Sequence, residues 1–177
     1  VVTVAPADDQ SAVGRTLSHE VDVWDHEMGY VVDGTPADCV VAGLESLVPE
    51  TDLVVAGCNR GANLGAYVLG RSGTVSAAVE ATFFDVPAIA VSMYIPVRED
   101  ADFTAINDAD LRYDEAVRAT TYLAEHSIEA GVFDQCDYLN VNAPVADWGP
   151  SPIVVTQPSQ EYEMTAERNG DAVTLHD

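Results

Sequence analysis

Two short segments carry the residue types that bind phosphate groups. Residues 57–65 form a loop in which asparagine and glycine recur, and Ser72-Gly73-Thr74 follows it. Hydroxyl groups and the unpaired N–H groups at the start of a helix donate to anions, and the helix dipole favours negative charge there. Ser72 and Thr74 would also cap a helix, a role compatible with phosphate binding. These segments therefore predict an anion-binding site.

The elements around these segments form a strand, a loop, a helix and a second strand. Leu53–Ala56 is an apolar strand, Val75–Phe84 is an alanine-rich helix, and Ala88–Ser92 is a second buried strand after Pro87. A βαβ unit of this kind builds parallel sheets whose sites lie at the carboxyl ends of the strands. The predicted fold class is α/β, a three-layer Rossmann-like domain with a mostly parallel sheet and a β-rich C-terminal extension.

The rest of the chain predicts one domain and an arm. Residues 1–147 form the Rossmann-like domain, and residues 148–177 form a β-rich C-terminal arm that belongs to the same domain and to the subunit contact. The tail includes Asn169-Gly170, a hairpin turn signal. In chain order we expect a strand over 1–5, a polar loop over 7–14, a short hairpin or excursion over 16–30, a helix from Thr35 to Leu47, an acidic loop over 96–108, a helix over 110–130, a strand over 138–142, and tail strands over 153–156, 161–164 and 172–175.

The charge of the chain is strongly negative. Its 177 residues include 30 acidic and 7 basic residues, all seven of them arginine, for a net charge of -23. Such a chain repels itself at low salt, and salt screens that repulsion. The acidic residues are scattered through an ordinary apolar pattern, and lysine is absent, which favours a high-salt cytoplasm over a mesophilic acidic protein. The lack of a basic patch excludes nucleic-acid polymers and anionic membranes as partners.

The cysteines indicate a reducing, cytoplasmic location. Cys39, Cys58 and Cys136 are odd in number and show no C-x-x-C spacing, so zinc and redox motifs are absent. Cys39 and Cys58 lie beside apolar runs and are expected in the core. No apolar run is long enough to span a membrane, and no signal peptide is visible. Because residues 1–4 already look like a strand, we expect that a natural N-terminal segment is missing.

Six stretches together carry a resemblance to a known family. The chain resembles the SurE survival-protein family of metal-dependent 5'-nucleotidases over residues 1–144, in the family's order. The Asn-x-Gly-x-Asn-x-Gly motif with Ser-Gly-Thr is the specific part. The matching stretches are Val4-Ala5-Pro6 followed by Gln10-Ser11 and Val13-Gly14; Gly34-Thr35-Pro36-Ala37-Asp38-Cys39-Val40; Gly57–Gly65; Ser72-Gly73-Thr74-Val75 with Ala77-Ala78; Pro87–Ser92; and Leu139-Asn140-Val141-Asn142-Ala143-Pro144.

The resemblance implies a site for a divalent cation, Mg²⁺ or Mn²⁺. In the family, two adjacent aspartates of an Asn-Asp-Asp-Gly motif, a serine and an asparagine hold the metal, and Ser11 and Asn59 match the last two. The Asn-Asp-Asp-Gly motif is absent, so no catalytic residue is assigned. Asp8-Asp9 does not replace it, because it falls inside the serine loop and no glycine follows. The domain over residues 1–147 is thus a SurE-type phosphatase domain that is N-terminally incomplete.

The resemblance also assigns phosphate-binding residues. These are Ser72, Gly73, Thr74 and Asn63, although Asn63 could instead serve only the turn. The chain departs from the family at Ala12, where glycine is usual, and at Arg71, where an aromatic residue is common. Arg60 and Arg71 are either charges of the anion site or surface ion-pair partners.

The implied activity is hydrolysis of nucleoside 5'-monophosphates to nucleoside and phosphate, as in a 5'/3'-nucleotidase, by a homodimer or homotetramer. Two alternatives remain at the level of the sequence. One is a non-catalytic nucleotide- or phosphate-binding module, since the strongest local signal is only an anion site. The other is an inactive fragment of the enzyme.

Overall fold

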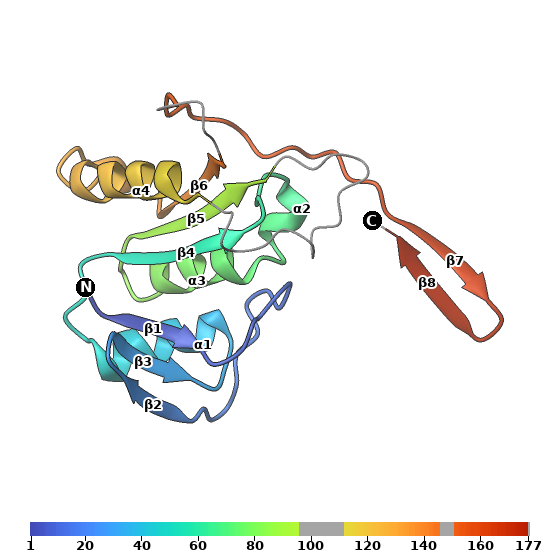
Figure 1. The fold of residues 1–177 in the computed structure, drawn as a ribbon, viewed down its shortest axis with the longest axis horizontal. Helices are drawn as coiled ribbons and strands as arrows, with labels where there is room; N and C mark the ends of the chain where they lie inside the picture. Colours follow the sequence, from blue (N-terminus) through green and yellow to red (C-terminus); the bar gives the residue numbers. More distant parts are fainter. Residues whose placement is uncertain (96–111, 146–150, 177) are drawn as a thin grey trace.

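The computed structural model of the chain describes residues 1–95, 112–145 and 151–176. It confirms the α/β fold class (Figure 1). The acidic loop expected over residues 96–108 and the start of the helix expected from residue 110 lie outside these ranges, as does the boundary proposed between residues 147 and 148. In chain order the elements are β1 (Thr3–Pro6), β2 (Val23–His26), β3 (Gly29–Val32), α1 (Pro36–Ala42), a π-helical turn (Gly43–Leu47), β4 (Val54–Arg60), α2 (Ala66–Leu69), α3 (Gly73–Thr82), β5 (Ala88–Tyr94), α4 (Asp114–His126), a 3₁₀ turn (Val132–Asp134), β6 (Tyr138–Pro144), β7 (Thr165–Asn169) and β8 (Ala172–His176).

Strand β5 is the middle strand of a parallel sheet in the order β4-β5-β6. Residues 88–93 are all buried. Because α3 covers one face of the sheet and α4 the other, β5 is a continuous apolar run without the alternation of a half-exposed strand. The predicted βαβ unit is therefore confirmed, with α3 beginning at Gly73, slightly before the expected Val75. The loop expected from Gly57 is wrong in its first part, because β4 pairs with β5 as far as Arg60.

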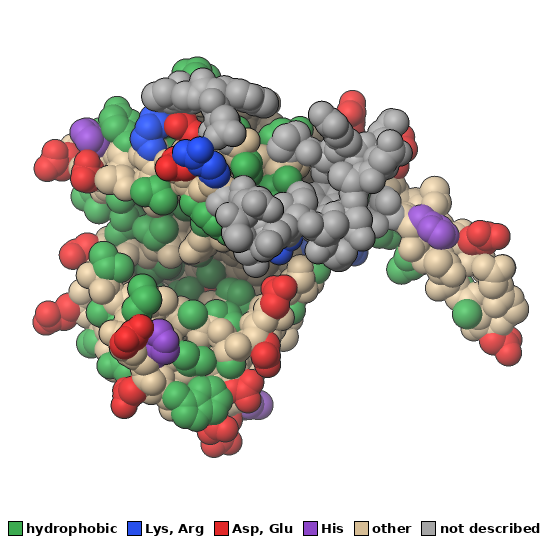
Figure 2. Space-filling view, in the orientation of Figure 1, with side chains coloured by type: hydrophobic (Ala, Val, Ile, Leu, Met, Phe, Trp, Pro, Cys, Tyr) green, Lys and Arg blue, Asp and Glu red, His purple; other side chains and the backbone are tan. Residues whose placement is uncertain are grey.

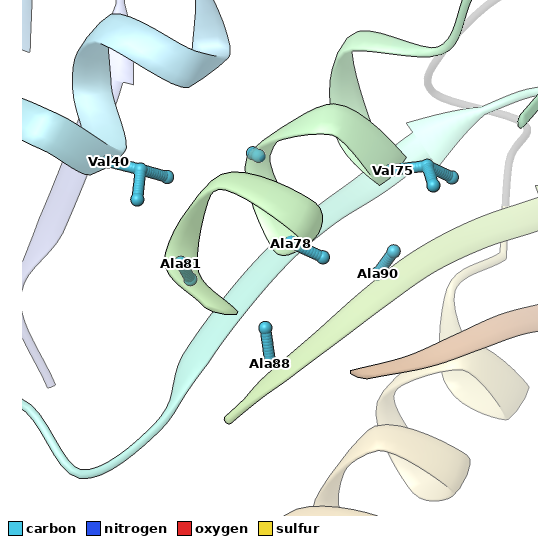
Figure 3. Close-up of a cluster of buried hydrophobic side chains, with 7 residues drawn as sticks. Val40, Val75, Ala78, Ala81, Ala88 and Ala90 are labelled. Carbon is cyan, nitrogen blue, oxygen red and sulfur yellow. The ribbon is translucent and has the colours of Figure 1, made fainter. Parts of the chain in front are cut away.

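Short side chains allow α3 to lie close to the sheet. Ala78 and Ala81 of α3 face Ala88 and Ala90 of β5, and all four are fully buried (Figure 3). The opposite face of β5 carries larger residues, including Ile89, which pack against α4. The small face fixes the height of α3 above the strands, and therefore where its first turn lies.

A capping box begins α1 at the expected residue. The Thr35 hydroxyl accepts a hydrogen bond from the Asp38 N–H at 3.1 Å, and the Asp38 carboxylate accepts one from the Thr35 N–H at 2.8 Å. Ser18 donates to the same carboxylate from its N–H at 2.7 Å and from its hydroxyl at 2.9 Å. Burial of Asp38 alone would raise its pKa, but these hydrogen bonds from Ser18 and Thr35 outweigh it and hold the pKa below its usual value.

The N-terminal strands form a second sheet in the order β1-β3-β2. β2 and β3 make the hairpin expected between residues 16 and 30, and β1 runs parallel to β3. Between β1 and β4 lies an apolar groove of about 520 Å³ whose walls come from both strands and from α1. Figure 2 shows this hollow between the two halves of the molecule. Among the described residues, no backbone pairing joins β1 to β4.

The tail reaches away from the body and ends in the β7–β8 hairpin (Figure 1). Asn169-Gly170 makes its turn, as predicted, with Gly170 at φ +64°. The strands expected over residues 153–156 and 161–164 are wrong. Val155 is fully exposed, and a β-prone run forms no strand unless a neighbouring backbone accepts its hydrogen bonds.

Two further expectations need correction. Helix α4 ends at His126, short of the expected residue 130, and turns lead from there to Gly131 at φ +67°. Cys39 is buried as predicted, and burial together with the Asp38 charge raises the pKa of its thiol to about 12. Cys58 is exposed, so its predicted core position is wrong. The register of β4 against β5 shifts between Ala56 and Asn59, which breaks the in–out alternation at Cys58.

Within residues 1–95, 112–145 and 151–176, the structure contains no helix of the length and apolarity needed to cross a bilayer.

The depressed pKa of Asp38 predicts a pH-dependent contribution to stability. Asp38→Asn should lower the free energy of unfolding at neutral pH by about 1–3 kcal/mol, because the amide nitrogen cannot accept the bonds from Ser18 and Thr35. A carboxylate whose folded pKa is depressed stabilises above its unfolded pKa, and that stability is lost as pH falls through the folded pKa.

The difference in the free energy of unfolding between the wild type and Asp38→Asn should therefore become smaller below about pH 4. Denaturant unfolding in multimolar KCl at several pH values measures it, with exposed Asp171→Asn as the control. A difference that stays constant down to about pH 2 would contradict the role of ionised Asp38.

Candidate active site

A pocket of about 460 Å³ lies where β1 and β4 end and α3 begins. Every site residue predicted from the sequence lines it, although the residues come from three separate segments. The carboxyl ends of the strands and the amino end of α3 thus meet in one place, as expected for an α/β sheet. The predicted site residues in this pocket are Ser11, Asn59, Asn63, Ser72, Gly73 and Thr74.

The first turn of α3 forms one wall of the pocket. Ser72 is the N-cap, and its hydroxyl accepts a hydrogen bond from the Val75 N–H at 3.2 Å. Ser72 therefore has the predicted capping role. Gly73 and Thr74 lie in the first turn of the helix, where backbone N–H groups have no hydrogen-bond acceptor within the helix. A Cβ on Gly73 would lie 3.0 Å from Pro36 and 3.1 Å from the Gln10 carbonyl. A side chain at this position would require Pro36 or the Gln10 backbone to shift by a few tenths of an ångström.

The loop that carries Ser11 is held against α3. The Gly14 N–H donates to the Arg71 carbonyl at 2.9 Å, and Arg15 donates to the buried Glu80 carboxylate at 3.0 and 2.8 Å. The Arg15 guanidinium also lies 4.6 Å from the centre of the Phe83 ring. These contacts fix Ser11 opposite the first turn of α3.

Asn59 lies near the end of β4, opposite Ser92 of β5. Its side-chain NH₂ donates to the Gly61 carbonyl at 2.6 Å, which leaves the amide oxygen as the group that can serve a ligand. Ser11 and Asn59 therefore offer a hydroxyl oxygen and an amide oxygen to one pocket. Asp8 and Asp9 line the same pocket.

The comparisons with known proteins agree with this geometry. Residues 1–166 match the family described as Survival protein SurE. The chain belongs to the SurE family. It is 74% identical over its whole length to a protein named 5'-nucleotidase SurE from Haloarcula marismortui, covering 66% of that protein, and 62% identical to one of the same name from Haloquadratum walsbyi, covering 67%. It spans about two thirds of the length of these curated relatives.

A solved structure supports the same conclusion about the fold. The crystal structure of SurE protein from Aquifex aeolicus superposes with a TM-score of 0.74 at 28% identity, over 99% of this chain and 70% of that one. The resemblance predicted from the motifs is therefore confirmed. The relatives from halophilic archaea also confirm the halophilic origin predicted from the composition.

Residues 61–65, which follow β4 and are called the asparagine loop, are anchored to β5 and β6 through Asn63. This buried residue donates its N–H to the Asn142 amide oxygen at 2.7 Å and its side-chain NH₂ to the Ser92 hydroxyl at 2.7 Å. Its carbonyl accepts from Asn140 at 2.8 Å and from Asn142 at 3.1 Å. Asn140 and Asn142 therefore act as structural supports, and phosphate binding by Asn63 stays a prediction.

The first departure from the family pattern, at residue 12, lies in a backbone conformation that favours glycine. Ala12 has φ +56°, a conformation that glycine adopts without the steric cost of a side chain. The second departure, Arg71, lines the pocket with its guanidinium 4.2 Å from the centre of the Tyr67 ring. The sequence did not single out Tyr67 or Ser92, because one aromatic and one strand serine carry no spacing signal. The short helix α2, which holds Tyr67, was not expected either.

The Asn63 anchor predicts unequal effects of two neighbouring asparagines. Asn142→Ala should lower the free energy of unfolding by about 1–3 kcal/mol, because it leaves the Asn63 N–H unpaired in a buried place. Asn140→Ala should lower the free energy of unfolding by a smaller amount, since the Asn63 carbonyl keeps its hydrogen bond from Asn142.

Denaturant unfolding measures both losses, and hydrogen exchange should show faster exchange over residues 59–65 in Asn142→Ala. Equal losses, or a larger loss for Asn140→Ala, would contradict this assignment.

Proposed function

We propose that this chain carries the substrate pocket of a phosphomonoesterase that hydrolyses nucleoside 5'-monophosphates to nucleoside and phosphate. The observation that supports it most is the meeting of Ser11, Asn59 and the Ser72-Gly73-Thr74 turn in one pocket. The relatives named 5'-nucleotidase SurE support the same substrate class.

The proposed phosphate site is the amino end of α3. Ser72, Gly73 and Thr74 would bind phosphate oxygens through backbone N–H groups and the Thr74 hydroxyl, which needs no rearrangement of the chain. Asn63 completes the predicted set from the neighbouring loop. In-line attack on phosphorus depends mainly on positioning and on stabilisation of charge, and a rigid turn supplies both.

A divalent cation, Mg²⁺ or Mn²⁺, is the proposed cofactor, but the described residues do not complete a site for it. Ser11 and Asn59 supply neutral oxygens, whereas hard cations are held with the help of carboxylates. Among the described residues, no group of three or more histidine, cysteine, aspartate or glutamate side chains is placed to hold a metal. When bound, such an ion would polarise the phosphoryl group.

The groove between β1 and β4 offers a route for the family's aspartate pair. The groove and the pocket share Pro6, Pro36 and Thr74 as lining residues, so one opens into the other. An extended segment seated in the groove, parallel to both strands, would place its carboxyl end in the pocket. We propose that the family's aspartate pair reaches Ser11 and Asn59 in this way.

A second copy of the chain is the proposed partner of the arm. Val154, Val155, Val173 and Leu175 are exposed along the tail, which reaches away from the body (Figure 1). Exposed apolar residues on an extended arm favour a homodimer or homotetramer in which the arm packs on a neighbouring subunit. The three free cysteines are consistent with the proposed cytoplasmic location.

The proposed activity predicts metal-dependent phosphate release. Protein that carries the acidic N-terminal segment should release phosphate from adenosine 5'-monophosphate in multimolar KCl when Mn²⁺ is present. Asn59→Ala should abolish most of this release, because it removes a predicted metal ligand, whereas Asn169→Ala in the exposed hairpin should not.

A folded sample of verified mass that binds the nucleotide without releasing phosphate would favour a non-catalytic binding module. Release that does not respond to Mn²⁺ would contradict the proposed cofactor.

The incomplete donor set predicts weak metal binding by residues 1–177 alone. Calorimetric titration with Mn²⁺ should give no tight site, and binding with a dissociation constant of about 10⁻⁶ M or tighter would contradict it. The same titration on protein that includes the aspartate pair is the control.

A further inference from the structure

We propose that Arg71 is a phosphate-binding residue of this pocket, acting beside the first turn of α3. This inference rests on the proposed function, because it assigns a further contact to the same phosphate. Arg71 immediately precedes the N-cap Ser72 and lines the pocket with Ser72, Gly73 and Thr74. Arg71 thus adds a positively charged residue to the lining of the pocket that holds the first turn of α3.

The backbone of Arg71 is fixed on both sides. Its N–H donates to the Val68 carbonyl at 3.0 Å, and its carbonyl accepts from the Gly14 N–H at 2.9 Å. The residue thus joins α2 to the loop that carries Ser11. Little freedom remains for the side chain to leave the pocket by a movement of the chain.

A stack of planar groups orients the side chain. The Arg71 guanidinium lies 4.2 Å from the centre of the Tyr67 ring, and the Tyr162 ring stacks on Tyr67 with centroids 3.5 Å apart. Two planar groups at these distances must occupy opposite faces of Tyr67. Tyr67 is therefore held between Arg71 and Tyr162. A contact with a ring face uses none of the guanidinium N–H groups as conventional hydrogen-bond donors, so they stay available for an anion.

The charge of Arg71 is not neutralised within the described structure. Among the residues described, no carboxylate forms an ion pair with Arg71, although acidic residues outnumber basic ones 30 to 7. Three other arginines do form such pairs: Arg15 with Glu80, Arg112 with Asp114 and Arg118 with Glu115.

The pocket needs such a cation. Asp8 and Asp9 line it and repel an anionic ligand. In multimolar salt the Debye length falls to about 3 Å or less, so distant charges neither attract nor repel the substrate strongly. A contact between a guanidinium and a phosphate oxygen survives this screening, because the two groups touch. Among the described residues that line this pocket, Arg71 is the positive charge that can make it.

The test is equilibrium binding without turnover. Calorimetry in multimolar KCl with a chelator, on residues 1–177, would compare inorganic phosphate, adenosine 5'-monophosphate and adenosine. Arg71→Ala should weaken phosphate and nucleotide binding about tenfold or more and leave adenosine binding unchanged. Arg71→Lys should bind phosphate and nucleotide with an affinity between those of the wild type and Arg71→Ala. Lysine keeps the positive charge but lacks the planar set of N–H donors of the guanidinium.

Arg168→Ala is the matched control, since it also removes one positive charge but lies in the exposed β7–β8 hairpin. It should bind all three ligands as the wild type does. Thermal unfolding shows whether Arg71→Ala is folded, and Arg71→Lys provides the same comparison if it is not.

Unchanged phosphate affinity in Arg71→Ala would overturn this inference while leaving the proposed function intact. An equal loss of adenosine affinity would also overturn it, by making Arg71 a contact for the base. A wild-type chain that binds neither phosphate nor nucleotide would overturn both this inference and the proposed phosphate site.

Discussion

The close contact between α3 and β5 is the constraint on which the rest of the structure depends. Ala78 and Ala81 meet Ala88 and Ala90 without a larger side chain between them. A larger residue at any of these four positions would raise the helix from the sheet, since a packed interior has no space to absorb it. The amino end of α3 would then leave the carboxyl ends of the strands, and the pocket would lose one wall. The alanine content of α3 is therefore a requirement of the site as much as of the core.

The two loops are held at the site by bonds to the helix and to the sheet on which it packs. Arg15 fixes the Ser11 loop to Glu80 on α3, while Asn63 fixes the asparagine loop to β5 and β6. Both anchors use buried or half-buried polar groups whose partners lie far away in the sequence. Such bonds are costly to leave unmade, so each loop has one favoured arrangement. Rigid elements thus position flexible ones, and the predicted ligands face one another without contributing to the core themselves.

The parts of the structure that the sequence predicted are those with a local signal. The capping box of Thr35, the buried run of β5 and the turn at Asn169-Gly170 each follow from neighbouring residues. The tail around Val155 was wrongly expected to be a strand, because strand formation requires a partner that β-propensity cannot supply.

Long-range contacts explain the other differences. Cys58 is exposed because β4 changes register against β5, a property of the pair of strands and not of either one. The sequence left open whether Arg71 serves the anion site or a surface ion pair, since the choice depends on its contact with Tyr67 and on no carboxylate of the described residues pairing with it. The six predicted site residues came together because the motif resemblance carries such long-range information.

The stack of Arg71, Tyr67 and Tyr162 joins the pocket to the arm. Tyr162 belongs to the tail that precedes β7, whereas Tyr67 and Arg71 line the pocket. In the proposed oligomer, a neighbouring subunit that orders the arm also favours the stack, and the stack orients the guanidinium. Two events that stabilise the same arrangement must favour each other by the same free energy. Phosphate binding at the proposed site and packing of the arm on a second subunit are then linked equilibria. The physical connection between them is one tyrosine ring with a cation on one face and the arm on the other.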